Sequence, residues 1–150
     1  MNLERVRPIE ILLIEDNDGD VFLTRKAFEM AGFASNLIVA SDGETALKML
    51  RKQEQYSEVI TPDIVLMDIN LPKVDGKQVL AEMKADKCMR RIPIIVLTSS
   101  QAEQDVLKAY DLQANSYILK PDDVEKFRAL IKVIENFWFN VALLPSRTLN

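Results

Sequence analysis

Short apolar runs rich in β-branched residues alternate along this chain with segments of helical spacing. The apolar runs cover residues 9–14, 36–40, 63–67, 93–98 and 116–119. Their length and composition predict five β-strands. Most of them lack a polar face, which is typical of parallel strands covered on both sides.

Between the runs, apolar residues recur at positions i, i+3 and i+4, which predicts a helix after each strand. The last of these stripes is the longest and extends from Val124 to Trp138. A β-α unit repeated five times predicts an α/β fold, with five helices on the two faces of a doubly wound, five-stranded parallel sheet. In such folds the functional groups gather at the carboxyl ends of the strands.

Polar residues that could form a binding or reactive site follow four of the five predicted strands. Glu15 and Asp16 follow the first strand, Asp68 follows the third, Thr98 ends the fourth and Lys120 follows the fifth. Because these strand ends share one edge of the sheet, we expect three carboxylates, a hydroxyl and an ammonium in a single pocket.

Three neighbouring carboxylates repel one another unless a proton or a cation joins them. The chain has no histidine and a single cysteine, so oxygen ligands dominate, and these select a hard ion such as Mg²⁺. With the charge neutralised, Asp68 can act as an oxygen nucleophile toward phosphorus and form an aspartyl phosphate. Thr98 and Lys120 would contact the phosphoryl oxygens, and the small Ser99 would leave room for them.

Composition excludes several other classes of function. A length of 150 residues suits one domain, and a net charge of −4 argues against direct binding of nucleic acid. The absence of histidine excludes Ser-His-Asp hydrolysis, and the four glycines lack the spacing of a nucleotide-binding loop. No apolar run is long enough to cross a membrane, and the N-terminal residues lack the apolar centre of a secretory signal. With Cys88 unable to form an internal disulfide, we expect a cytoplasmic protein.

Taken together, these residues resemble the receiver domain of two-component response regulators. Two stretches, IEDNDGDVFLTRKAF and FWFNVALLP, are more specifically similar to stand-alone regulators of cyanobacterial phytochrome kinases. The resemblance implies a flavodoxin-like sheet of order 2-1-3-4-5. It also implies phosphorylation of Asp68 by a sensor histidine kinase of phytochrome type, and an output protein that the sequence does not identify. The signal would be a change in the surface of the fourth helix, fifth strand and fifth helix, with no enzymatic activity beyond self-phosphotransfer and autodephosphorylation.

The resemblance also assigns roles to individual positions. The metal ligands would be Glu15, Asp16, Asp68 and the backbone carbonyl of Asn70. Thr98 and Tyr117 would form the conformational switch, and the peptide bond before Pro121 would be cis.

Alternatives compete with these assignments. The acids after the first strand could mark a helix start instead, although Asp18 and Asp20 could cap that helix alone. A doubly wound aspartyl-phosphate phosphatase needs a second acid two residues after its nucleophile, and that position is Asn70. A flavin-binding carrier of similar topology is disfavoured by the scarcity of glycine and by the acidic pocket.

The chain divides into an N-terminal tail at residues 1–8, a domain at 9–138 and a C-terminal extension at 139–150. The end of the chain is apolar on more than one side, which is typical of a contact surface. We expect a symmetric homodimer that uses the fifth helix and this extension. The predicted contacts are Phe137, Trp138, Phe139, Val141, Leu143 and Leu144. The alternative is that the tail folds back over its own domain.

Overall fold

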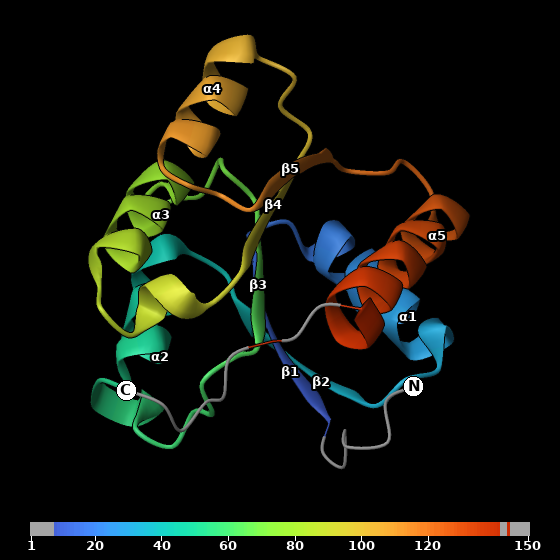
Figure 1. The fold of residues 1–150 in the computed structure, drawn as a ribbon, viewed down its shortest axis with the longest axis horizontal. Coiled ribbons are helices and arrows are strands. Elements are labelled where there is room, and N and C mark those ends of the chain that lie inside the picture. Colours follow the sequence, from blue (N-terminus) through green and yellow to red (C-terminus); the bar gives the residue numbers. More distant parts are fainter. Residues whose placement is uncertain (1–7, 142–143, 145–150) are drawn as a thin grey trace.

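The computed structural model describes residues 8–141 and residue 144. It contains a fully parallel sheet of order β2-β1-β3-β4-β5 (Figure 1). The strands are β1 Ile9–Ile14, β2 Ser35–Ala40, β3 Ile64–Met67, β4 Ile94–Thr98 and β5 Ser116–Leu119. Each strand begins and ends within one residue of its predicted bounds. The alternation of strands and helices confirms the α/β fold, and the strand pairing confirms the flavodoxin-like order.

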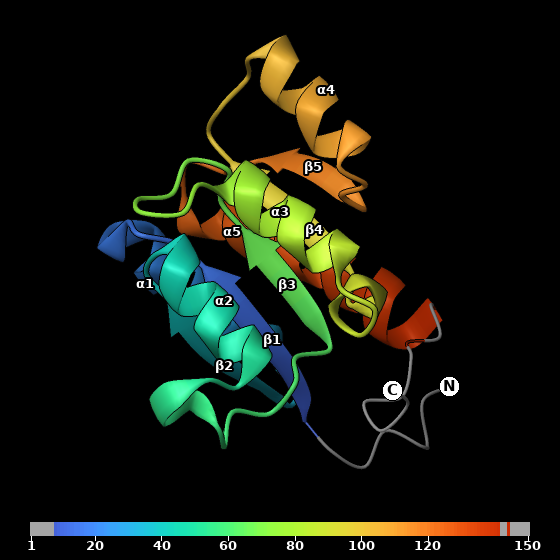
Figure 2. The same ribbon diagram turned by 90° about the vertical axis from the view of Figure 1, so that its left-hand side faces the viewer.

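Helices cover both faces of the sheet, as predicted. They are α1 Asp18–Ala31, α2 Gly43–Arg51, α3 Gly76–Ala85, α4 Glu103–Asp111 and α5 Val124–Ile134, with short 3₁₀ turns η1 Glu54–Tyr56 and η2 Met89–Arg91. Helices α1 and α5 lie on one face, and α2, α3 and α4 lie on the other (Figures 1 and 2). Alternate strand residues enter the two cores, with Leu12 and Ile14 in one and Ile11 and Leu13 in the other. In the described part of the chain, no helix has the length and apolarity needed to cross a bilayer.

The last helix departs from its predicted course. After Ile134 the chain continues as a π-helical segment, η3 Glu135–Val141, whose turns are wider than those of an α-helix. The residue that enters the core is therefore Phe139, five positions after Ile134, while the ring of Phe137 is exposed and Trp138 is half-buried. Phe139 packs on Phe33 with ring centroids 5.2 Å apart.

This packing corrects part of the dimer prediction. Phe139 is only 5% exposed, so it packs within its own domain and presents little surface to a partner. Leu144 also packs against this core, as the fold-back alternative anticipated. The side chain of Val141, all of Leu143, most of the predicted C-terminal extension and residues 1–7 lie outside the described residues.

Two glycines lock the loop after β3 against its neighbours. A side chain at Gly43 would overlap the carbonyl of Val74, and a Cβ at Gly76 would lie 2.6 Å from the carbonyl oxygen of Ile69. The loop also contains Lys73 in a left-handed conformation, with φ of 65°. These close approaches fix the segment that carries Asp68 and Asn70 relative to the start of α2.

Candidate functional site

The strand register brings the predicted site residues to one edge of the sheet. Ile14 pairs with Met67 and Thr98 with Leu119, so the residues that follow β1, β3 and β5 emerge side by side. The backbone N–H of Asp68 donates to the carbonyl of Ile14 at 3.0 Å, and that of Lys120 donates to the carbonyl of Thr98 at 2.9 Å. The predicted gathering of Glu15, Asp68, Thr98 and Lys120 is therefore present.

Asp68 is buried, and both of its carboxylate oxygens accept hydrogen bonds. The Thr98 hydroxyl donates to Oδ1 at 2.7 Å, and the backbone N–H of Asn70 donates to the same oxygen at 3.0 Å. The Lys120 ammonium lies 2.6 Å from Oδ2. Groups from three separate segments of the chain thus hold this one carboxylate in place.

Lys120 is held by three carboxylates. Its Nζ lies 2.7 Å from Glu15 Oε1, 2.7 Å from Asp20 Oδ2 and 2.6 Å from Asp68 Oδ2, and its side chain is 9% exposed. Burial lowers the pKa of Lys120, but the hydrogen bonds to Asp20, Asp68 and Glu15 outweigh it and raise the pKa above its ordinary value. The ammonium has three N–H donors, so these acids occupy all of them and the group remains charged.

A second cluster of oxygens adjoins this ammonium. Glu15, Asp16 and Asp68 each offer a carboxylate oxygen, and these atoms lie within 4.8 Å of one another. Burial raises the pKa of Glu15 above its usual range, although the hydrogen bond and charge of Lys120 partly oppose this. A buried carboxylate resists ionisation unless more positive charge is close. An all-oxygen cluster of this kind fits a hard divalent cation.

Tyr117 connects the site to the loop before α4. Its hydroxyl donates to the carbonyl of Ser100 at 3.0 Å, and its backbone N–H donates to the hydroxyl of Tyr110 at 3.1 Å. The Ser100 hydroxyl in turn donates to Asp105 Oδ2 at 2.6 Å. The Ser100 backbone N–H completes the path, since it donates to the Thr98 hydroxyl oxygen at 3.4 Å.

The structure corrects two details of the predicted site. Asp20 does not cap α1, because the N-cap is Asn17, whose Oδ1 accepts from the backbone N–H of Asp20 at 2.9 Å. The peptide bond between Lys120 and Pro121 is trans, like every other peptide bond in the described part of the chain. The trans form is favoured at an ordinary X-Pro bond by roughly 0.5–1 kcal/mol.

Two contributors were missed in the sequence. The sequence suggests only a possible capping role for Asp20, and its contact with Lys120 joins residues 100 positions apart, which no local pattern signals. Ser100 contacts Tyr117 and Thr98 through its backbone carbonyl and N–H, groups that every residue except proline possesses, and its hydroxyl binds Asp105. Ser99, by contrast, is exposed directly beside Thr98, where the sequence placed it.

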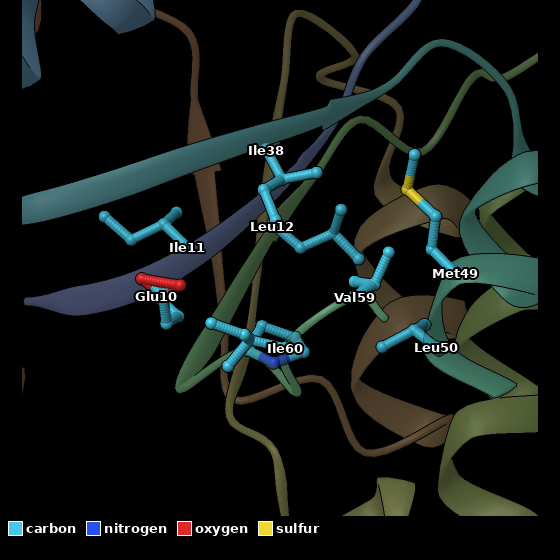
Figure 3. A pocket seen from close by; sticks show the side chains of 9 residues that line it. Glu10, Ile11, Leu12, Ile38, Met49, Leu50, Val59 and Ile60 are labelled. Carbon is cyan, nitrogen blue, oxygen red and sulfur yellow. The ribbon is translucent and has the colours of Figure 1, made fainter. Parts of the chain in front are cut away.

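A small apolar pocket lies at the opposite end of β1 (Figure 3). It is lined mainly by side chains of β1, β2, α2 and the segment around Ile60. Its one carboxylate, Glu10, already accepts a hydrogen bond from the Asn36 side chain at 2.7 Å. The pocket therefore has no part in the site at the carboxyl edge.

Known proteins share this sequence and fold. The sequence matches the response regulator receiver domain family over residues 11–132. It is 36% identical over 146 residues to the response regulator Rcp1 of Synechocystis sp., covering 97% of this chain and 99% of Rcp1. The structure of the phosphorylated cyanobacterial phytochrome response regulator RcpA superposes with a TM-score of 0.88 at 39% identity, covering 93% of this chain and 99% of that one. The Mn²⁺-bound form of Rcp1 gives a TM-score of 0.85 at 37% identity, covering 93% of this chain and 100% of that one. The chain therefore belongs to the response regulator receiver domain family.

Proposed function

We propose that Asp68 accepts a phosphoryl group from the phosphohistidine of a sensor kinase. The observation that supports this most is the orientation of one buried carboxylate by Thr98 and Lys120 beside two further acids. An Asp68 oxygen forms a bond to phosphorus while the phosphorus–nitrogen bond breaks, and the electron pair leaves with the imidazole. Because the carboxylate is already an anion, no general base is required.

Glu15, Asp16, Asp68 and the backbone carbonyl of Asn70 would hold Mg²⁺. The cation, when bound, neutralises the carboxylates and the phosphoryl oxygens. The Lys120 ammonium and the Thr98 hydroxyl already point at Asp68, so a small shift carries them to the phosphoryl oxygens. Exposed Ser99 leaves space beside Thr98 for the incoming group. The protein turns over no substrate besides its own phosphoryl group.

The signal would pass through Thr98 and Tyr117. A bond between Thr98 and the phosphoryl group would favour the arrangement in which the Tyr117 hydroxyl reaches the carbonyl of Ser100. Phosphorylation then shifts a pre-existing equilibrium between two positions of this loop. The responding surface comprises α4, β5 and α5, where Leu107, Tyr110 and Leu119 are exposed. An output protein would dock on these side chains.

The partners are part of the same proposal. RcpA is described as a cyanobacterial phytochrome response regulator, and its 39% identity supports a phytochrome-type histidine kinase in the cytoplasm as the phosphodonor. We also retain the symmetric homodimer, now built on α5 and the exposed ring of Phe137 with half-buried Trp138 beside it.

Replacing Asp68 with asparagine tests the assignment. Wild-type protein incubated with acetyl phosphate and Mg²⁺ should gain the mass of one phosphoryl group, and Asp68→Asn should gain none. Asp75→Asn is the matched control, because Asp75 lies in the same loop and an amide oxygen can still cap α3. Labelling of Asp68→Asn at the wild-type rate would refute the phosphoacceptor, and labelling that survives a chelator would refute the role of Mg²⁺.

A further inference from the structure

Asp20 is the third carboxylate on Lys120, and it differs from the other two. It lies in the first turn of α1 at the open side of the site, where its side chain is 28% exposed, against 4% for Glu15 and 8% for Asp68. Glu15 and Asp68 also belong to the oxygen cluster that fits a cation. Among the described residues, Asp20 is the acid on Lys120 that lies outside this cluster.

We propose that Asp20 is a positioning residue that holds the Lys120 ammonium beside Asp68 once a cation engages the other two acids. The inference rests on the proposed function and adds a residue to it. Lysine carries its charge on a flexible four-carbon stem, so the ammonium needs an anchor to stay in one place. A bound cation would compete for the oxygens of Glu15 and Asp68, whereas Asp20 lies outside that cluster and would keep its ion pair.

The backbone of Asp20 is itself fixed, which makes it a suitable anchor. Its N–H donates to the N-cap side chain of Asn17 at 2.9 Å, and its carbonyl accepts from the Thr24 hydroxyl at 2.7 Å. The carboxylate therefore projects from a defined point on α1, and the ion pair ties that helix to the end of β5.

A spectroscopic experiment tests the anchor without any phosphorylation. In metal-free protein, exchange of the Lys120 ammonium protons with water is followed by ¹H–¹⁵N NMR. Asp20→Asn should accelerate this exchange about tenfold, as expected for losing one charge-assisted hydrogen bond. Asp18→Asn is the matched control, since it removes the same charge from an exposed position in the same turn and should leave the exchange unchanged. Equal exchange in wild type and Asp20→Asn would overturn the proposal.

Labelling kinetics then test the role in phosphoryl acceptance. At saturating Mg²⁺, Asp20→Asn should be labelled by acetyl phosphate several-fold more slowly than wild type and Asp18→Asn. Its half-saturating Mg²⁺ concentration should stay unchanged, whereas Glu15→Gln should raise that concentration. In a Lys120→Met background, followed over longer times, Asp20→Asn should have no further effect.

Each outcome distinguishes this inference from the proposed function. Labelling of Asp20→Asn at or above the wild-type rate, or an undiminished effect in the Lys120→Met background, would overturn the positioning role while Asp68 remains the acceptor. Wild-type protein that is not labelled would refute the proposed function, and the positioning role would fall with it.

Discussion

Individual side chains show which parts of a site can be predicted from a sequence. Asp68, Thr98 and Lys120 could be predicted because each stands at the end of an apolar strand, and parallel strands end together. The role of Asp20 could not be predicted, because an acid in the first turn of a helix is ordinarily explained by its favourable interaction with the helix dipole. Its partner is a lysine 100 positions away, so only the folded chain reveals the contact.

The cap of α2 gives a pH-dependent prediction. Burial raises the pKa of Asp42, but hydrogen bonds from the backbone N–H and hydroxyl of Thr45, with the charge of Lys73, outweigh it and lower the pKa. A carboxylate with a lowered folded-state pKa stabilises the fold above its unfolded pKa of about 3.9, and this contribution disappears as pH falls through the folded value. Asp42→Ala should therefore lower the free energy of unfolding by about 1 kcal/mol at pH 7. The deficit should shrink below about pH 4.

Urea denaturation at a series of pH values measures this effect. Asp42→Asn is the control, because its amide oxygen can still accept from Thr45 but cannot be protonated in this range. It should retain most of the stability and lose the acid-dependent part of the difference. A deficit in Asp42→Ala that stays constant from pH 7 to below pH 4 would contradict the assigned pKa shift.

At the scale of elements, α4 buries the fewest residues of the five α-helices. Ala109 is its one buried residue, and no side chain caps its first turn. The helix is instead tied by Asp105, which lies 2.6 Å from Lys77 Nζ on α3 and accepts from Ser100. Because the Ser100 carbonyl also accepts a hydrogen bond from the Tyr117 hydroxyl, the position of α4 depends on a few polar contacts near the switch.

Loosening one of these contacts should free the start of α4. Lys77→Met should increase hydrogen exchange at the backbone amides of the first turn of α4 several-fold, with little change in the sheet, because local opening reflects few supporting contacts. Lys73→Met serves as the control, since that lysine lies in the preceding loop and its ion pairs, at 3.8 and 3.9 Å, do not involve α4. Unchanged α4 exchange in Lys77→Met would show that the ion pair does not restrain the helix.

The elements themselves could be predicted where their hydrophobic period was regular. The three central strands were recognisable because both of their faces are buried, which gives nearly uninterrupted apolar runs. The π-helical segment was not, because an i, i+3, i+4 stripe assumes the repeat of an α-helix. From Ile134 that repeat leads to Trp138, whereas the observed turn leads to Phe139.

For the whole molecule, repeated β-α units leave few possible topologies, so the sheet could be predicted from the sequence. The placement of the C-terminal aromatics could not, because an excess of apolar residues indicates that they need cover without indicating which surface provides it. In the structure one of these aromatic rings is covered by the core and another is not. Phe139 joins the core shared by α1 and α5, and Phe137 remains 51% exposed.

Truncating these two aromatic side chains should affect stability differently. Phe139→Ala should lower the free energy of unfolding by about 3 kcal/mol, because it leaves a cavity beside Phe33. Phe137→Ala should leave stability nearly unchanged and, if the proposed homodimer forms there, should shift sedimentation toward the monomer. Denaturation and analytical ultracentrifugation of both variants measure this. A stable Phe139→Ala protein would contradict the observed packing, and a wild-type monomer would remove the dimer.

Because the turn after α5 is wide, the number of residues between Ile134 and the next buried ring decides which aromatic side chain faces outward. With one residue deleted between Ile134 and Phe139, the spacing between them becomes four, and an ordinary helical turn suffices to bring that phenylalanine inward. The choice of which aromatic meets solvent thus depends on a single peptide unit. Relatives could alter this end of the molecule by insertion or deletion alone, without replacing any aromatic side chain.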